Sequence, residues 1–288
     1  LPMECVPTKF RTSSLIWEAL LPSLGLTALI RNLGNMSKCG LLSKGNWDIK
    51  KQIGNKIVNR EALKKARVHP IAILSALCTY SSGHGIRGKG EWEVIPDIVD
   101  ALDDAFYLSF GNVQPTNKRR ILALDVSGSM SGGSVGGVIG LTPRMASSAL
   151  AMITYTRESS CEIIAFQKEI VPLDISCKKS LKDIVNYTDG MPFGGTDCAQ
   201  PMLWALKNNI KVDSFEIYTD SETWYGDIHP SQALNKYRKA FNIPAKMVVL
   251  GMVSNSFSIA DPNDSGQLDV VGFDTSVPEV INNFIREC

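Results

Sequence analysis

Residues 121–126 (ILALDV) form an apolar run with a single carboxylate, Asp125, and a loop rich in serine and glycine follows. A run without polar alternation is typical of a strand buried on both faces, as in a parallel sheet covered by helices. Further strand patterns lie at residues 162–166, 214–219, 246–251 and 268–273. Helical patterns separate them, at residues 143–158 and around Leu181, Met202, Gln232 and Val280. This alternation predicts an α/β domain with a doubly wound parallel sheet.

The preceding part of the chain has helical patterns interrupted by proline, glycine and asparagine. The predicted helices are one through Trp17 and Leu21 that Pro22 breaks, one through Leu26 and Leu33 that stops at Gly34, one from Arg60 to about Val68 that Asn59 caps, and one that starts at Pro70. Short helices joined by turns bury their faces only by stacking on neighbours, as in an α-solenoid, although no clean sequence period is present.

The chain has 288 residues, which exceeds the roughly 100–200 residues of one ordinary domain. We therefore predict two domains, a helical one over residues 1–117 and an α/β one over residues 118–288. The apolar fraction of 44% excludes a disordered chain, and seven irregularly spaced cysteines exclude a disulfide-dense scaffold. Reduced thiols in a cytosolic protein are expected.

Hard oxygen ligands follow several of the predicted strands. The motif Asp-x-Ser-x-Ser follows the first strand, Gly-Gly-Thr-Asp opens a later helix, and the strand ending at Thr219 leads into an aspartate. Hydroxyls and carboxylates at one sheet edge suit a divalent cation such as Mg²⁺. The candidate ligands are Asp125, Ser127, Ser129, Thr196 and Asp220. Such residues also cap helices and form turns, and a cation held there could be purely structural.

These five positions resemble the metal-ion-dependent adhesion site (MIDAS) of von Willebrand factor A domains. All five positions expected in that motif match, and they occur in the expected order along the chain.

Charge is distributed unevenly along the chain although the formal net charge is +1. Residues 1–90 hold 14 basic and 4 acidic residues, while the remainder holds 16 basic and 25 acidic residues. A basic segment fits a polyanion such as nucleic acid, and it equally fits a solvated surface.

Six residues of the basic segment are candidate phosphate contacts. Lys64 and Arg67 share one predicted helix face with Arg60, which would also suit an ordinary solvated face. Arg31 lies among apolar residues, so its charge must reach solvent or meet an anion. The run GHGIRGKG at residues 83–90 matches G-x-G-x-x-G but follows a predicted helix, so we interpret it as a basic loop and not a dinucleotide site. The candidates are Arg31, Lys64, Arg67, His84, Arg87 and Lys89.

The resemblance extends over nearly the whole chain. The segments LTALIRNLGNM, KKARVHPIAILSAL, SSGHGIRGKG, DVSGSM, GGTDCAQPMLWA, TDSETW and IADPNDSGQLDVVGFDT resemble the TROVE family of Ro (SS-A) ribonucleoprotein autoantigens. The resemblance implies a ring of HEAT-like helical repeats closed by a von Willebrand A domain. It also implies that the N-terminal part of the helical-repeat region, with about half the ring, is absent from this sequence, which leaves ring closure in question.

The same resemblance implies a ribonucleoprotein component of RNA quality control. Members of the family bind small cytoplasmic Y RNAs on the outer surface of the ring and single-stranded ends of misfolded non-coding RNAs in its hole. We expect this chain to be a non-catalytic RNA-binding monomer in the cytoplasm, with a nuclear fraction also compatible.

Two other classes of function compete with RNA binding. A cation-dependent adhesion module would use the same five ligands to bind an acidic side chain of a protein partner, but it leaves the basic segment unexplained. A hydrolase or phosphoryl transferase is disfavoured because the three histidines are far apart and no nucleophile elbow or P-loop is present. Cys198 has no identifiable base, so we expect a packed thiol.

A membrane partner is not expected. The apolar stretch at residues 15–30 contains Glu18 and Pro22, and it falls short of the ~20 residues that span a bilayer. Two short buried helices fit it better.

Overall fold

A computed structural model describes residues 3–43, 45–85, 90–171, 173, 179–191, 194–220, 225–253 and 259–287, the side chain of Glu4 excepted. The chain divides into two compact units. The first, here the helical unit, comprises Leu1–Val113 with Gly137–Gly140, and the second, here the sheet unit, comprises Gln114–Gly136 with Leu141–Cys288. The predicted boundary at residues 117/118 lies a few residues further along the chain.

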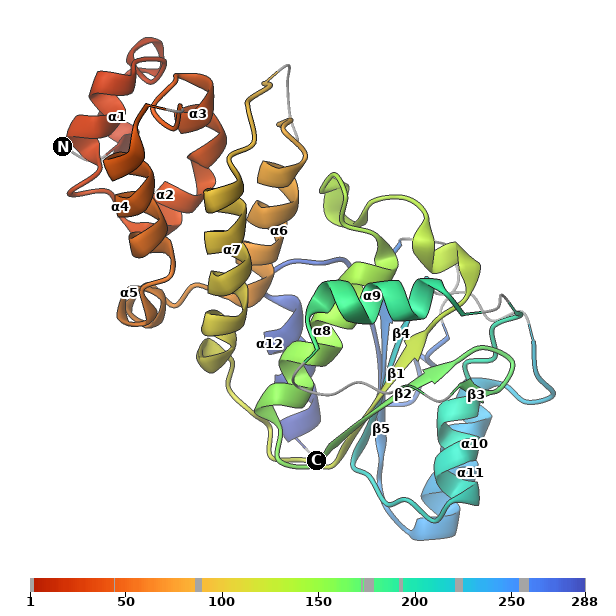
Figure 1. Ribbon diagram of the computed structural model, residues 1–288. Coiled ribbons are helices and arrows are strands. Elements are labelled where there is room, and N and C mark those ends of the chain that lie inside the picture. Colours follow the sequence, from red (N-terminus) through yellow and green to blue (C-terminus); the bar gives the residue numbers. More distant parts are fainter. Residues whose placement is uncertain are drawn as a thin grey trace. The chain divides into compact units, whose positions relative to one another are not determined.

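The helical unit is built from short helices (Figure 1). Their buried apolar side chains form its core. Its helices are α1 (Ser14–Leu20), α2 (Leu26–Arg31), α3 (Leu33–Lys38), α4 (Trp47–Ile57), α5 (Arg60–Lys65), α6 (Pro70–Ser81) and α7 (Pro96–Leu108), with 3-10 turns at Met3–Cys5, Thr8–Phe10 and Ser109–Asn112. Trp17, Leu29, Met36 and Phe106 are fully buried in its core. The predicted helical region is confirmed, whereas its HEAT-like character stays a prediction.

The prediction that Gly34 ends the second helix was wrong. Helix α2 ends at Arg31, where the Asn32 side chain donates to the Ala28 carbonyl at 2.8 Å, and Gly34 lies inside α3. A Cβ at Gly34 would lie 2.8 Å from the ring of Trp92. Glycine is therefore required by close packing of an aromatic ring, not by a helix end.

Asn59 caps α5 as predicted, since its side chain accepts from the backbone N–H of Ala62 at 2.9 Å. The helix ends at Lys65 and not near Val68. Pro70 starts α6 at its first turn, as predicted. Helices α4 and α7 were not predicted from the sequence.

The sheet unit alternates strands and helices (Figure 1). Its strands are β1 (Arg120–Asp125), β2 (Cys161–Phe166), β3 (Ile170–Val171), β4 (Ser214–Thr219), β5 (Lys246–Gly251) and β6 (Gln267–Val271). Its helices are α8 (Pro143–Arg157), α9 (Leu181–Asp189), α10 (Gln200–Lys207), α11 (Pro230–Phe241) and α12 (Val277–Arg286), with 3-10 turns at Gly128–Ser131 and Val135–Gly137.

The described strands form one sheet in the order β3-β2-β1-β4-β5-β6. All pairs are parallel except β2 with β3, which is antiparallel. The sheet is therefore mixed, whereas the sequence predicted a parallel one. The exception arises because β3 folds back directly after β2 through a short turn, without a crossover helix. The predicted positions of the other strands agree with the structure to within two residues.

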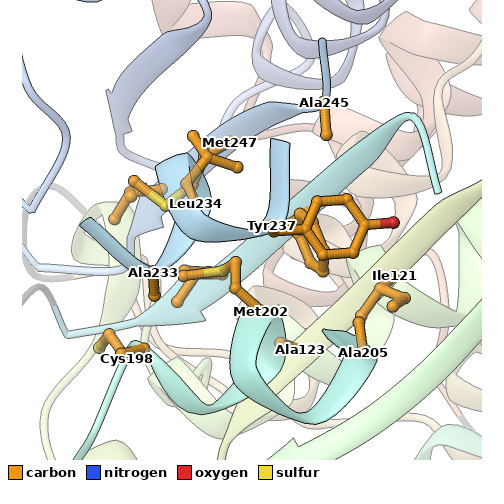
Figure 2. Close-up of a cluster of buried hydrophobic side chains, with 14 of the residues drawn as sticks. Ile121, Ala123, Cys198, Met202, Ala205, Ala233, Leu234, Tyr237, Ala245 and Met247 are labelled. Atoms are coloured by element: carbon orange, nitrogen blue, oxygen red, sulfur yellow. The ribbon is translucent and has the colours of Figure 1, made fainter. Parts of the chain in front are cut away.

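Helices cover both faces of the sheet. Helices α10 and α11 pack on the face that carries Ile121 and Ala123 of β1, together with Phe215 and Met247 (Figure 2). Helix α8 packs on the opposite face, and α9 packs on α8. All six residues of β1 are buried, which explains why its sequence shows no polar alternation.

A buried ionic network fixes the beginning of β1. The guanidinium of Arg120, which is 2% exposed, contacts Glu216 at 2.6 Å and Glu158 at 2.7 Å, and it donates to Asn282 of α12 at 3.0 Å. Glu158 also accepts from the backbone and hydroxyl of Thr116. Burial alone would lower the pKa of Arg120, but the two carboxylates raise it above its ordinary value. The network joins β1, β4, the end of α8 and α12.

Replacing Arg120 by methionine should destabilise the protein by about 3–5 kcal/mol, because two carboxylates would stay buried without their cation. The neighbouring Arg119→Met is the matched control, since its pair with Asp213 is partly exposed and should contribute about 1 kcal/mol at most. Chemical denaturation measures both. Equal losses in the two variants would contradict the assigned role of the network.

None of the helices in the described part of the chain is long and apolar enough to cross a membrane.

Candidate functional site

The carboxyl ends of β1, β2 and β4 meet at one edge of the sheet. Strand β1 lies between β2 and β4. The chain adds β2 and β3 on one side of β1 and then β4, β5 and β6 on the other side, so the strand order reverses at β1. Ligands of open α/β sheets bind at such a switch point. Of the predicted metal ligands, Asp125 ends β1, Ser127 and Ser129 follow it, Asp220 follows β4, and Thr196 lies between α9 and α10.

Asp125 ends β1 with its carboxylate held at both oxygens. Oδ1 accepts from the backbone N–H of Ser127 at 2.8 Å, and Oδ2 accepts from the hydroxyl of Thr219 at 2.7 Å. The carboxylate is 1% exposed. Burial raises its pKa, with a smaller contribution from the charge of Asp220. The two aspartates therefore lie close enough for their charges to interact.

The loop after β1 turns two serine hydroxyls toward each other. The Oγ atoms of Ser127 and Ser129 lie 3.1 Å apart, with Ser127 buried and Ser129 exposed. Adjacent ligands of an octahedral Mg²⁺ with bonds of 2.0–2.1 Å are about 3 Å apart. The spacing of these hydroxyls thus fits two neighbouring positions of such a shell.

Thr196 lies on the connection between α9 and α10, which passes beside the end of β2. Its carbonyl accepts from the N–H of Tyr225 at 3.1 Å, and the next residue, Asp197, donates its N–H to the carbonyl of Gln167 just beyond β2. The Asp197 carboxylate accepts from the backbone N–H of Ala199 and from the side-chain amide of Gln200, just before and at the start of α10. Gly226 packs against that carboxylate, where a Cβ would lie 2.7 Å away.

Asp220 follows β4 and is half-buried, with its Oδ1 3.5 Å from the Thr219 hydroxyl. Hydrogen bonds thus link Asp125 to Ser127 and Thr219, while Thr196 is held beside β2. Among the described residues no three His, Cys, Asp or Glu side chains cluster as metal ligands. The candidate site instead combines two carboxylates with hydroxyls, a donor set that suits a hard cation.

Two supporting residues were missed from the sequence. Thr219 orients Asp125, and the only signal was a hydroxyl at a strand end. Arg144 of α8, 2% exposed, donates to the Ser127 carbonyl at 3.0 Å and to Ser131, and it pairs with Asp189 at 2.8 Å. Through these contacts Arg144 joins the loop after β1 to the end of α9. The sequence of α8 shows no clear signal for this role, because the helix also contains serines, threonines and a second arginine.

Mg²⁺ should raise the melting temperature of the wild-type protein, because a ligand at 100 times its Kd stabilises the folded state by about 2.7 kcal/mol. Ser129→Ala should reduce that shift, since it removes an exposed hydroxyl ligand without opening the core. Differential scanning fluorimetry with and without Mg²⁺ measures the effect.

Ser134→Ala is the matched control, because Ser134 is exposed and is not among the predicted ligands. Identical Mg²⁺-dependent shifts in the wild type and in Ser129→Ala would contradict the predicted ligand set.

The candidate cations of the helical unit are exposed. Arg31 lies in the last turn of α2 and Lys64 in the last turn of α5. Arg31 also borders an open cavity of about 700 Å³ lined by Leu24, Thr27 and Ala28. Neither side chain, nor that of Arg67, forms a salt bridge with a described acid. The charge of Arg31 therefore reaches solvent, one of the two predicted outcomes.

The prediction that Arg67 shares a helix face with Arg60 and Lys64 was wrong. Arg67 has a φ of 48° and follows the end of α5. The N–H of Val68 bonds to the carbonyl of Leu63 at 3.1 Å, and that of Arg67 bonds to Lys64 at 3.1 Å. These two bonds form a Schellman closure, which the burial of Leu63 and Val68 stabilises.

Arg67→Gly should stabilise the protein by about 0.5–1 kcal/mol, because glycine adopts the left-handed conformation at lower steric cost. Urea denaturation tests this. Lys65→Gly, inside the last helical turn, is the control and should destabilise by about 0.5–1 kcal/mol. A loss of stability in Arg67→Gly would contradict the assigned backbone strain.

The described ends of the loop between α6 and α7 pair through an isolated antiparallel bridge between His84 and Glu91. The N–H of Gly85 bonds to the carbonyl of Gly90 at 2.9 Å, and that of Trp92 bonds to Gly83 at 3.0 Å. His84 is exposed and its Nδ1 lies 4.0 Å from a carboxylate oxygen of Glu91. Arg87 and Lys89 lie outside the described residues.

The histidines and Cys198 have structural surroundings. His69 caps α6 by accepting from the N–H of Ile71 at 3.2 Å, and burial lowers its pKa to about 4. His229 caps α11 in the same way through Ser231. Cys198 is fully buried in the apolar core (Figure 2), in agreement with the predicted packed thiol.

Comparison with known families supports the resemblance seen in the sequence. A family model described as the Ro60 vWA domain matches residues 119–285, and one described as the TROVE domain matches residues 3–80. The chain belongs to the TROVE family of Ro60 proteins. The expected family, the helical N-terminal region and the von Willebrand A fold are therefore confirmed.

Two curated Ro60 relatives are similar over almost the whole chain. Both are named RNA-binding protein RO60. The one from Deinococcus radiodurans is 44% identical over 286 residues, covering 99% of this chain and 54% of that protein. The one from Caenorhabditis elegans is 40% identical over 284 residues, covering 98% and 43%. The chain thus spans about half the length of these relatives.

A solved structure agrees with the fold. The crystal structure of the Deinococcus radiodurans RO (RSR) protein matches with a TM-score of 0.93 at 44% identity, covering 100% of this chain and 58% of that one.

Proposed function

We propose that this protein binds RNA through the cations of its helical unit and catalyses no reaction. The observation that carries the proposal is that Arg31, Lys64 and Arg67 are exposed and form no salt bridge with a described acid, in a chain 44% identical to a protein named for RNA binding. Cations that are not neutralised by the protein itself are free to neutralise phosphates.

The proposed ligands are small cytoplasmic Y RNAs and the single-stranded ends of misfolded non-coding RNAs. Lysine and arginine contacts to phosphates position an RNA without reading its bases. Selection would then depend on strandedness and shape, which suits the surveillance of misfolded RNA. His84 and, from the sequence, Arg87 and Lys89 are proposed as further RNA contacts.

The sheet unit would serve a separate role in the proposal. Asp125, Ser127, Ser129, Thr196 and Asp220 would hold a divalent cation, Mg²⁺ by the chemistry of the donors, which would fix the loops at the sheet edge. The sparse and irregularly spaced cysteines fit a reducing compartment, so we propose a cytoplasmic protein. We propose a monomer.

Replacing Arg31, Lys64 and Arg67 together by alanine should weaken RNA binding across sequences. With about 0.7 counterions released per phosphate of a single strand, loss of three contacts should reduce the slope of log K against log salt by about 2. Fluorescence anisotropy over a salt series measures both quantities.

A matched triple variant removes Lys207, Lys236 and Lys239, which are exposed cations on helices of the sheet unit. It changes the net charge equally but should keep the wild-type slope. If the two triple variants lose affinity and slope to the same extent, the helical unit has no special role in binding.

A cation-dependent adhesion module is the second candidate function. Ser129 is exposed and Asp220 is half-buried, so the candidate cation site is open to solvent on one side, where an acidic side chain of a protein could complete its shell. EDTA distinguishes the two functions. A partner bridged by the cation should be released, whereas RNA bound by the helical unit should stay bound.

A further inference from the structure

Trp47 differs from the other tryptophans that the structure describes in the helical unit. Trp17 is fully buried, and the ring of Trp92 packs between Gly34 and the stacked ring of Tyr80. Trp47, by contrast, is 67% exposed. Large aromatic side chains are mostly buried, so an exposed tryptophan is an informative exception.

The indole of Trp47 is also not used for internal hydrogen bonding within the described part of the chain. The indole N–H of Trp17 donates to the Arg11 carbonyl at 2.7 Å, and that of Trp92 donates to the Tyr80 carbonyl at 3.0 Å. The indole N–H of Trp47 has no hydrogen-bond acceptor among the described residues. The Trp47 ring is therefore held neither by burial in the core nor by a hydrogen bond of its indole N–H to a described residue.

A cation fixes one face of the ring. The ammonium of Lys50, one helical turn along α4, lies 5.1 Å from the ring centroid. Such a cation–π contact orients the indole and leaves its second face to solvent. A planar ligand could stack on that second face while its phosphate meets the ammonium groups nearby.

The exposed surface of α4 continues this arrangement. Trp47, Lys51 and Asn55 recur every four residues and are all exposed, so they form one row along the helix. Ile53 and Ile57 are buried and define the opposite side. The row presents an aromatic ring, a cation and an amide in succession.

Charge identifies the occupant of this row. Residues 47–67, which include α4 and α5, contain seven Lys or Arg and two Asp or Glu. The exposed neighbours of Trp47 on α4 are polar, unlike the apolar surroundings of an aromatic anchor in a protein interface. A positive surface with an exposed aromatic face suits single-stranded nucleic acid, whose bases are free to stack.

We propose that Trp47 is a stacking platform for an unpaired base of RNA, with Lys50 and Lys51 at the adjoining phosphates. The inference rests on the proposed function and adds to it a contact that distinguishes single-stranded from double-stranded RNA, because bases inside a duplex cannot reach the ring. Helix α4 would thus select unpaired bases, which phosphate contacts alone cannot do.

The test compares the 288-residue wild-type protein with Trp47→Ala and Trp47→Phe in fluorescence anisotropy with a labelled uridine decamer and a labelled blunt RNA duplex. Trp47→Ala should weaken decamer binding by about 5-fold to about 150-fold, the range measured for loss of one stacked base. Trp47→Phe should retain most of the affinity. Duplex binding and the salt slope should stay unchanged, since stacking releases no counterions.

Leu15→Ala is the matched control, because Leu15 is 74% exposed in the same unit and carries no stacking face. It should bind like the wild type, and unfolding midpoints verify that all variants are folded. Wild-type affinity of Trp47→Ala for the decamer overturns the inference and leaves the proposed function intact. Equal weakening by alanine and phenylalanine, or equal weakening for decamer and duplex, also overturns it. Failure of the wild type to bind either RNA overturns the proposed function itself.

Discussion

The parallel pairing of β1 between β2 and β4 determines the geometry of the sheet unit. Parallel strands end at one edge of a sheet, so the loops after all three strands emerge together. Oxygen-bearing side chains that lie far apart in the chain consequently meet, as where the Thr219 hydroxyl donates a hydrogen bond to the Asp125 carboxylate. Without this pairing, the serines, threonines and aspartates of these loops would be ordinary caps and turn residues.

Buried cations hold this arrangement from both ends of β1. Arg120 joins the start of β1 to Glu158 and Glu216, and Arg144 joins the loop after β1 to α8 and α9. Each of these charges would be costly to bury alone and is offset by carboxylates and carbonyls. The candidate cation site thus rests on elements whose positions are fixed by other charges, as a preorganised site requires.

Most of the sheet unit could be predicted from sequence because strands buried on both faces and the amphipathic helices between them have distinct patterns. Strand β3 was missed because two residues establish no periodicity. Gly34 was misjudged because the residue that requires it, Trp92, is distant in sequence, and Arg67 because equal spacing was taken to imply a continuing helix. Arg144 and Thr219 act through contacts that only the folded chain reveals. The candidate metal ligands could be named because their order along the chain is itself informative, whereas single exposed cations carry no comparable signal.

The central claim is a division of labour, in which the helical unit contacts RNA while the sheet unit holds a cation. Photocrosslinking of the protein to a single-stranded RNA with 4-thiouridine, followed by mapping of the crosslinked peptides, tests it most directly. The account predicts crosslinks within residues 31–92 and none within residues 119–285. Crosslinks confined to residues 119–285 would contradict it.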